Sequence, residues 1–233
     1  MVGKEIIDLS QEIYGGMPVY KSLPSVSMTV YATHEQWDGI ENSSEQTPSV
    51  YNLEMSEHTG THVDALNHMD RKYDDQSIDQ MPLSMFFTEG ICLDFSDKNV
   101  NELITSGDIA KACKSCNVEI KKGDTVLLYT DHYKKHFDTQ NWGKGPGITA
   151  EAAAFLGKKE IAAFGVETMS PGIPGISNRE VHKICGALGF THYENMVNLY
   201  KLIGRGRFQF IAFPLKIKGG TGSPVRAVAV FDQ

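Results

Sequence analysis

The sequence lacks a long apolar segment, a basic segment and a cysteine-rich pattern, and each absence excludes a class of protein. No apolar run approaches the ~20 residues that cross a bilayer, and candidates such as 161–166 and 227–231 have the length of strands. Acidic residues outnumber basic ones by 29 to 22, and no basic run of five interrupts the chain, so a nucleic-acid-binding surface is excluded. Four cysteines in 233 residues are too few for a disulfide scaffold.

The N-terminal residues show no targeting signal. Met1 to Glu5 contain no apolar stretch of the secretory type, and Glu5 is an acid where such a signal has none. Without export, the cysteines are expected to be reduced thiols. The sequence therefore predicts a cytoplasmic protein.

The composition is typical of a folded chain of moderate size. Hydrophobic residues make up 41% and charged residues 22%, and 233 residues can bury a sizeable core. We find no internal repeat and no composition shift that marks a boundary. We predict one mixed α/β domain over 1–233, with a β-rich core and flanking helices.

Runs rich in β-branched and aromatic residues, bounded by Gly, Pro and polar clusters, predict the strands. They span 5–10, 26–32, 50–56, 86–94, 125–130, 160–166, 208–217 and 225–231. Helices are predicted over 103–116, over 150–157 with Thr149 as cap, and from Ser177 onward. Ser177 and Glu180 there have the spacing of a capping box. The buried stripe of this last helix is predicted to contain Val181, Ile184, Cys185 and Leu188.

Two long polar stretches, 33–49 and 131–147, have no periodicity and are predicted to be lids or interfaces. The first contains Trp37, and the second contains Tyr133, Phe137 and Trp142. We expect these rings to form an aromatic wall around a flat substrate.

The most informative segment runs from His58 to His68. Three of the eight histidines and a carboxylate lie within these eleven residues, as His58, His62, Asp64 and His68. Imidazole nitrogen and carboxylate oxygen are the ligands that Zn²⁺ prefers, at ~2.0–2.2 Å. A polar loop whose histidines bond to backbone is the alternative, but the coincidence of ligand type and spacing favours a metal site.

A bend is needed to bring these ligands together. In a straight strand His58 and Asp64 share a face but lie ~20 Å apart, at ~3.3 Å per residue. A regular helix is disfavoured by Gly60 and its β-branched neighbours. We predict a strand end that bends at Gly60, where no Cβ obstructs the turn, with His68 coming round afterwards.

The segment from His58 to His68 resembles the His-x-Gly-Thr-His-x-Asp-x-x-x-His signature of the cyclase-like metal hydrolases. That family includes bacterial kynurenine formamidase and isatin hydrolase. Residues 6–10, 17–20, 165–168 and 222–227 are similar to its first strand, the loop after it, its middle strand and its closing segment. The resemblance covers nearly the whole chain and implies a swivelling β/β/α fold.

The resemblance also implies roles for individual residues. His58, His62 and Asp64 look like the ligands of a first divalent ion, with Asp64 bridging to a second ion that His182 and Glu194 complete. His68 matches the catalytic acid/base, and Tyr20 lies in a loop that approaches the substrate in the family. Spacing alone would describe His182 as a half-buried helix histidine and Glu194 as a solvated acid.

The chain departs from the formamidase pattern in two places. Lys21-Ser22-Leu23-Pro24 follows Tyr20 where Pro-Gly-Asp is typical, which puts N-formylkynurenine in doubt as the substrate. Leu66 stands where Pro is common, and this change leaves ligation possible because Pro contributes no ligand.

The predicted function is divalent-metal-dependent hydrolysis of a small amide, lactam or lactone. Metal-activated water would attack the carbonyl, and His68 would be the general acid/base. Zinc is expected from the ligand types, with one or two ions per subunit, and manganese stays open. A homodimer or higher homo-oligomer is expected from the resemblance. The alternatives are a mononuclear manganese enzyme of isatin-hydrolase type and a catalytically silent binding protein on the same fold.

Other patterns in the chain are weaker evidence of function. Cys113 and Cys116 form a Cys-x-x-Cys pair in a predicted helix, but no second pair follows at ribbon spacing. His132 and His136 are assigned to the surface of the second lid, and His34 and His192 receive no role. No Gly-x-Gly-x-x-Gly follows a strand, and no Gly-x-Ser-x-Gly is present, so nucleotide binding and serine hydrolysis are unsupported.

Overall fold

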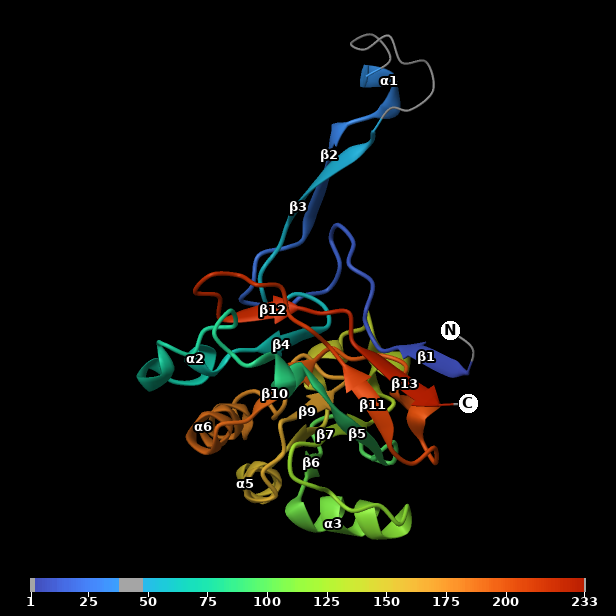
Figure 1. Cartoon of the computed structure of the whole chain (residues 1–233), viewed down its shortest axis with the longest axis vertical. Helices are drawn as coiled ribbons and strands as arrows, with labels where there is room; N and C mark the ends of the chain where they lie inside the picture. Colours follow the sequence, from blue (N-terminus) through green and yellow to red (C-terminus); the bar gives the residue numbers. More distant parts are fainter. Residues whose placement is uncertain (1–2, 38–47, 233) are drawn as a thin grey trace.

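A curled nine-stranded sheet forms the centre of the molecule (Figure 1). The computed structural model describes residues 3–37 and 48–232. Along the sheet the strands follow the order β1 (Lys4–Asp8), β13 (Val228–Asp232), β11 (Phe208–Ile211), β5 (Phe87–Asp94), β7 (Thr125–Tyr129), β9 (Ala163–Val166), β10 (Thr191–Glu194), β4 (His62–Asp64) and β12 (Gly222–Pro224). The strands from β5 to β10 are parallel, and the flanking pairs are antiparallel.

Three helices lie along one side of this sheet: α3 (Ser106–Ser115), α5 (Ala150–Lys158) and α6 (Asn178–Leu188) (Figure 1). Parallel strands covered by helices read as continuous apolar runs, and β7 and β9 are buried almost throughout. The core side chains include Ile91, Leu93, Leu127, Phe164 and Phe210. This mixed α/β architecture confirms the predicted fold class.

N-cap residues set the first residues of α3 and α5. The helix predicted over 103–116 is shorter, because Leu103–Ile104 form strand β6, which pairs with β8 (Gly147–Ile148) in a small separate sheet. Thr105 then caps α3 in a capping box with Asp108. For α5 the prediction is confirmed, since the Thr149 hydroxyl accepts a hydrogen bond from the Ala152 amide.

The capping box predicted for α6 is wrong. Ser177 is the N-cap residue, but its hydroxyl accepts from the Ile173 amide, and Glu180 pairs with Lys183 at 2.8 Å. A local loop contact therefore replaces the helix cap. The predicted stripe is right for Val181 and Cys185, whereas Leu188 at the helix end is exposed.

Short elements at the site were not predicted. Strands β4, β10 and β12 have three or four residues and carry polar side chains, so no apolar alternation marks them. The strand predicted over 208–217 ends at Ile211. The remaining short helices are α1 (His34–Trp37), α2 (Leu66–Met69), α4 (His132–His136), η1 (Arg71–Tyr73), η2 (Leu83–Phe86), η3 (Trp142–Lys144) and η4 (Leu199–Leu202).

Only one of the two stretches predicted to be lids or interfaces lies wholly within the described residues. The stretch 131–147 contains α4 and η3, and the Trp142 ring stacks on His132 with centroids 5.3 Å apart. Trp142 is buried and also meets the edges of Tyr133 and Phe137, so this segment is a packed aromatic cluster. In the stretch 33–49, residues 38–47 and the Trp37 side chain lie outside the described part of the chain.

Strands β2 (Ser27–Ala32) and β3 (Val50–Glu54) pair only with each other and project from the body of the molecule (Figure 1). Neither belongs to the nine-stranded sheet. Within residues 3–37 and 48–232, no helix is both long and apolar enough to cross a membrane.

Candidate metal centre

The centre begins at the bend before β4. Gly60 has φ +63°, a left-handed conformation that L side chains rarely adopt, as the predicted bend requires. The bend brings the His58 and His62 rings to 5.2 Å between centroids. Because β4 has a period of two, His62 and Asp64 then point to the same face of the sheet.

The neighbouring strand β10 adds two more side chains on this face. Glu194 lies directly opposite His62 in the antiparallel register, so the two share a face, and His192 shares it two residues earlier. The Thr191 hydroxyl donates to the Asp64 carbonyl at 2.5 Å and holds β10 against β4. The pairing of two short polar strands therefore assembles the floor of the site.

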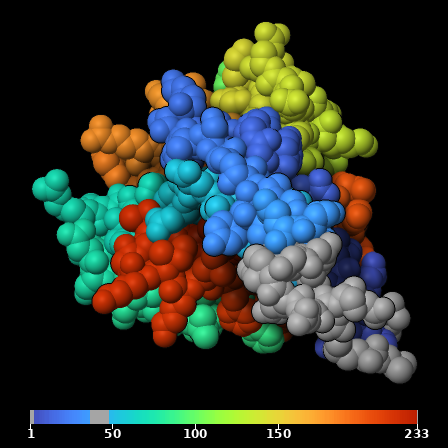
Figure 2. Space-filling view, turned by 90° about the horizontal axis from the view of Figure 1, so that it is seen from above, coloured from blue at the N-terminus to red at the C-terminus, as the bar shows by residue number. Residues whose placement is uncertain are grey.

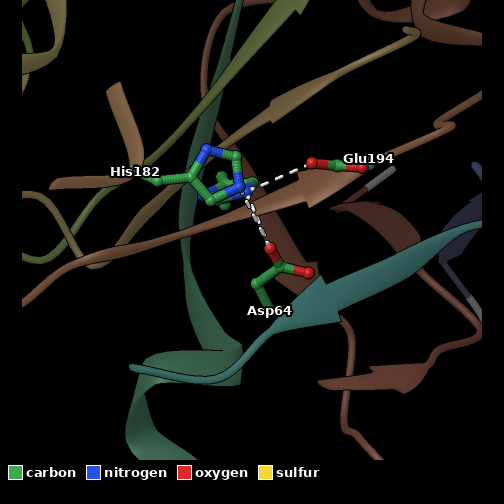
Figure 3. Close-up of side chains that lie close together, drawn as sticks. Asp64, His182 and Glu194 are labelled. Carbon is green, nitrogen blue, oxygen red and sulfur yellow. Dashed lines mark ion pairs between the residues drawn. The ribbon is translucent and has the colours of Figure 1, made fainter. Parts of the chain in front are cut away.

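Two helices complete the group. His182 comes from α6, and Figure 3 shows His182, Asp64 and Glu194 pointing toward one another from α6, β4 and β10. His68 lies on α2, one turn after Asp64, and its Nε2 is 3.6 Å from Asp64 Oδ2.

Asp64 is the centre of the arrangement. It is buried, and its carboxylate oxygens lie within 3.6 Å of a nitrogen from each of five histidines. The distances are 2.8 Å to His58, 3.4 Å to His62, 3.6 Å to His68, 3.5 Å to His182 and 3.1 Å to His192. Glu194 lies 3.5 Å from His62 and 3.3 Å from His192.

These atoms form two groups with the dimensions of a metal site. Ligand atoms of Asp64, His182, His192 and Glu194 all lie within 4.8 Å of one another, and so do those of His58, Asp64 and His68. The shared member is Asp64. A carboxylate common to two such groups is able to bridge two cations, since it has two oxygens and about four lone-pair sites.

Hydrogen bonds on the far sides of three rings fix which nitrogen of each ring faces Asp64. His62 Nδ1 lies 2.8 Å from the Gly60 carbonyl, and His182 Nδ1 lies 2.8 Å from the Asn178 carbonyl. A carbonyl only accepts, so each Nδ1 carries a proton and each Nε2 is the nitrogen that faces Asp64. When Nε2 is deprotonated, each ring is the tautomer that binds a metal through Nε2.

A longer chain of contacts orients the His58 ring. The Thr221 hydroxyl donates to Glu57 Oε2 at 2.7 Å, so its oxygen accepts from His58 Nε2 at 3.0 Å. Nδ1 is the nitrogen that faces Asp64, and it hydrogen-bonds Asp64 Oδ1 at 2.8 Å. Glu57 thus fixes the orientation of the His58 ring through one intervening hydroxyl.

The charge balance of the site follows from its burial. Burial disfavours the ionised form of Asp64, but His192, His182 and His58 hold its pKa well below 3.8. Burial likewise opposes protonation of His62, yet the Asp64 contact and the Glu194 charge raise its pKa above 6.5. The pKa of His68 is lowered, chiefly by burial and by the neighbouring histidines against the opposing charge of Asp64.

The structure brings the predicted ligands together and adds one residue that was not predicted. The predicted ligands and acid/base are brought together; they are His58, His62, Asp64, His68, His182 and Glu194. His192 was left without a role but is fully buried in the same group. The signal for it is the His-x-Glu spacing of 192 and 194, which repeats the His-x-Asp spacing of 62 and 64.

A cavity of about 190 Å³ opens onto these residues. Tyr20, Ser22 and Leu23 line it on one side, so the segment that departs from the formamidase pattern is part of the wall. Met169 and Asn178 also line it. Of the residues predicted to contact substrate, Tyr133 and Trp142 do not line this cavity, and the Trp37 side chain is outside the described residues.

Comparison with protein families supports the motif reading. The Cyclase family model matches residues 7–172 of the chain. The isatin hydrolase of Roseibium aggregatum is 28% identical over 194 residues, which cover 77% of this chain and 73% of that protein. The kynurenine formamidase of Bacillus cytotoxicus is 27% identical over 231 residues, or 98% of each protein.

Among solved structures, isatin hydrolases have a similar fold. Isatin hydrolase A from Labrenzia aggregata, solved with benzyl benzoate bound, has a TM-score of 0.83 and 26% identity. The match covers 99% of this chain and 94% of that one.

Proposed function

Since the chain belongs to the Cyclase family, we propose that it is a divalent-metal-dependent hydrolase of a small amide, lactam or lactone. Both similar proteins, the isatin hydrolase and the kynurenine formamidase, are named for hydrolysis of a C–N bond. The cavity beside Asp64 is small, which suits a substrate of one or two rings.

The observation that carries the proposal is the set of imidazole nitrogens that face Asp64. His58 Nδ1, His62 Nε2 and His182 Nε2 all have their opposite ring nitrogen bonded to a protein group. His62 Nε2 and both nitrogens of His192 are buried without a hydrogen-bond partner among the described residues. Buried nitrogens of this kind fit a cation, which would satisfy them.

We assign the residues to two ligand sets. His58, His62 and Asp64 would hold one cation, and Asp64 would bridge to a second that His182 and Glu194 bind. His192 lies within the second group and is proposed as a further member. Imidazole and carboxylate suit zinc first and manganese as the alternative, and one ion or two is a question of stoichiometry.

The chemistry of the reaction divides between the cation and the chain. A divalent cation here supplies Lewis acidity, which polarises a carbonyl and lowers the pKa of bound water from about 15.7 toward ~7. The pKa of His68 is lowered, so its ring is neutral at pH 7. His68 can therefore accept a proton from the attacking water before it donates one. His68 lies at the cavity wall, from which it would return that proton to the leaving nitrogen or oxygen.

Asp64 is the residue whose loss tests the proposal most directly. Asp64→Asn removes the shared carboxylate charge, and we expect the purified variant to lose bound metal and hydrolysis of formyl-anilides, isatin and lactones together. Asp232→Asn, an exposed acid of the same type, is the matched control and should keep both.

Metal analysis and the substrate panel also separate the alternatives. One metal ion per chain with isatin as the preferred substrate would indicate a mononuclear enzyme of isatin-hydrolase type. No bound metal and no hydrolysis by the wild-type chain would overturn the proposal and leave a binding protein on the same fold.

We further propose a homodimer or higher homo-oligomer, and the cytoplasmic location stays a prediction.

A further inference from the structure

Asn178 lies beside the candidate metal centre without belonging to either ligand group. It is the first residue of α6 and lines the cavity that opens onto Asp64. On the face seen in Figure 2, the blue N-terminal segment, which contributes Tyr20 to this cavity, adjoins the orange segment that contains α6. Residues four apart on a helix share a face, with Cβ atoms ~5–6 Å apart, and His182 follows Asn178 by four residues. The Asn178 side chain is therefore a neighbour of a candidate ligand.

The Asn178 side-chain amide is held in one orientation. The Gly172 backbone N–H lies 3.1 Å from one atom of this amide. A backbone N–H only donates, so that atom is the oxygen Oδ1, and the NH₂ group occupies the other position. The two segments meet through bare backbone, because a Cβ on Gly172 would lie 2.7 Å from Asn178 Cα. The direction of the NH₂ group is therefore set by the protein before any substrate binds.

The NH₂ group of Asn178 has no hydrogen-bond acceptor within residues 3–37 and 48–232, since its side chain bonds only through Oδ1. The other amide that lines the cavity is already used, because Asn195 Nδ2 donates to the Gly60 carbonyl at 3.1 Å. The Ser170 hydroxyl likewise donates to the Gly172 carbonyl at 2.8 Å. Asn178 Nδ2 is therefore the amide donor that the cavity offers to a bound molecule.

A donor at this position matches the charge that develops when an amide or lactone is hydrolysed. Addition of water to the carbonyl carbon moves the electron pair of the C=O π bond onto oxygen, which becomes an oxyanion. Pre-oriented donors stabilise that charge, and removal of one donor costs ~10²–10³ in kcat. The carboxylates of Asp64 and Glu194, which line the same cavity, only accept when they are ionised and cannot supply this donor.

We propose that Asn178 is a substrate-binding residue whose Nδ2 donates a hydrogen bond to the oxygen of the reacting carbonyl. The inference rests on the proposed function and adds a residue outside both ligand sets. The bond from water oxygen to the carbonyl carbon forms while His68 takes the water proton. The bond from carbon to the leaving nitrogen or oxygen then breaks, the C=O bond re-forms, and the leaving atom takes that proton. Asn178 keeps its own protons throughout and strengthens its hydrogen bond while the oxygen is charged.

Two substitutions separate this donor from a role in holding the loop at Gly172. Asn178→Asp keeps an oxygen acceptor for the Gly172 amide but has no NH₂ group. Asn178→Leu removes the acceptor and the donor together without adding a charge. Asn117→Asp is the matched control, since Asn117 is exposed and does not line the cavity.

Two readouts are measured on zinc-loaded protein of known zinc content. The first is kcat and KM for formanilide, isatin and a lactone, and the second is the Kd of acetohydroxamic acid by titration calorimetry. Acetohydroxamic acid binds zinc through its carbonyl oxygen, so it presents a charged oxygen to Asn178 without being turned over.

We expect both Asn178 variants to lose ~10²–10³ in kcat with a smaller change in KM, because the donor acts on charge that develops during the reaction. Their Kd for acetohydroxamic acid should rise roughly tenfold, as for loss of one hydrogen bond to a charged group. Zinc content should be unchanged in both variants, and every value for Asn117→Asp should match the wild type.

Wild-type kcat and Kd in Asn178→Asp would overturn the inference, because the residue would then only hold the loop. Wild-type values in Asn178→Leu would overturn it as well. So would loss of zinc from Asn178→Asp, since Asn178 would then act through His182, whose Nδ1 donates to its carbonyl. If the wild type hydrolyses none of the three substrates, the proposed function fails, and the Kd values decide the inference separately.

Discussion

At the residue scale, Asp64 shows why the candidate metal centre needs a cation or protons. A buried carboxylate is costly unless it is compensated, and here five imidazoles surround it. His192 is the one that sequence reasoning left without a role, because it lies in a short strand whose polar pattern resembles a loop. His192 is identified only once the fold is known, because its buried ring then lies beside Asp64 and Glu194.

His68→Ala tests the assignment of the acid/base. His68 is at the edge of the cavity and 3.6 Å from Asp64, and its removal should cost ~10²–10⁴ in kcat while metal content is unchanged. The rate and the bound metal are measured on the same preparation. His136→Ala, outside the cavity lining, is the control that should keep the rate; full activity in His68→Ala would disprove the assignment.

Glu167 is a buried carboxylate outside the candidate metal centre, and it predicts a pH dependence of stability. Its carboxylate accepts from the Thr130 amide and hydroxyl and from the His132 amide, yet burial raises its pKa to about 7. A raised pKa in the folded state means that the proton binds more tightly there. The contribution to stability is therefore full below pH 4.5 and is lost as the pH rises through 7.

Glu167→Gln should remove this dependence, because the amide stays neutral and keeps an acceptor. We expect the unfolding free energy of the wild type to fall by up to about 3 kcal/mol, relative to the variant, between pH 4.5 and 7. Urea unfolding at several pH values measures the difference. Parallel curves for the two proteins would mean that Glu167 does not titrate in this range.

At the element scale, β12 explains a glycine that no local turn requires. A Cβ on Gly222 would lie 2.8 Å from His58 Cε1 and 3.0 Å from the Val63 carbonyl, so the strand packs against the histidine ring through bare backbone. Gly222→Ala should push His58 from its position and lower metal affinity with a modest loss of stability. Zinc titration and thermal unfolding measure the two effects.

Gly143→Ala is the matched control for this prediction. A Cβ at Gly143 meets no atom within 4 Å among the described residues, and the backbone there has no positive φ. It should change neither metal affinity nor stability by more than a few tenths of a kcal/mol. Unchanged zinc binding in Gly222→Ala would show that β12 does not position His58.

Elements with a strong apolar pattern were predictable, and those that build the site were not. The strands β5 and β7 follow from their continuous apolar residues. The polar strands β4 and β10 form because they pair with each other, and because β10 also pairs with β9; no local signal reveals this pairing. The aromatics of the segment 131–147 pack on one another without helical or strand periodicity, and its role as a lid stays a prediction.

At the scale of the whole molecule, the ligand set ties distant parts of the chain together. His58 and Glu194 are 136 residues apart in the sequence and meet through Asp64 and His62. A cation that binds only the folded chain stabilises it by about 2.7 kcal/mol at a concentration one hundred times Kd. Chelation should therefore lower Tm, as differential scanning calorimetry would measure.

The control for metal removal is Asp64→Asn, whose Tm should not respond to chelator. If the wild-type Tm is also unaffected, the cluster does not bind a cation tightly in the folded state.

The motif from His58 to His68 could be located from sequence because four donors lie close together in the chain. His182 and Glu194 entered through family resemblance, because spacing does not reveal that α6 and β10 converge on β4.

The order in which the chain leaves the ribosome has a consequence for the metal centre. The motif of His58, His62 and Asp64 is synthesised first, but it is held by β10 on one side and by β12, beginning at Gly222, on the other. Strand β12 begins 160 residues after His62. The growing chain therefore cannot complete this ligand geometry until residues 222–224 have been synthesised and have paired with β4.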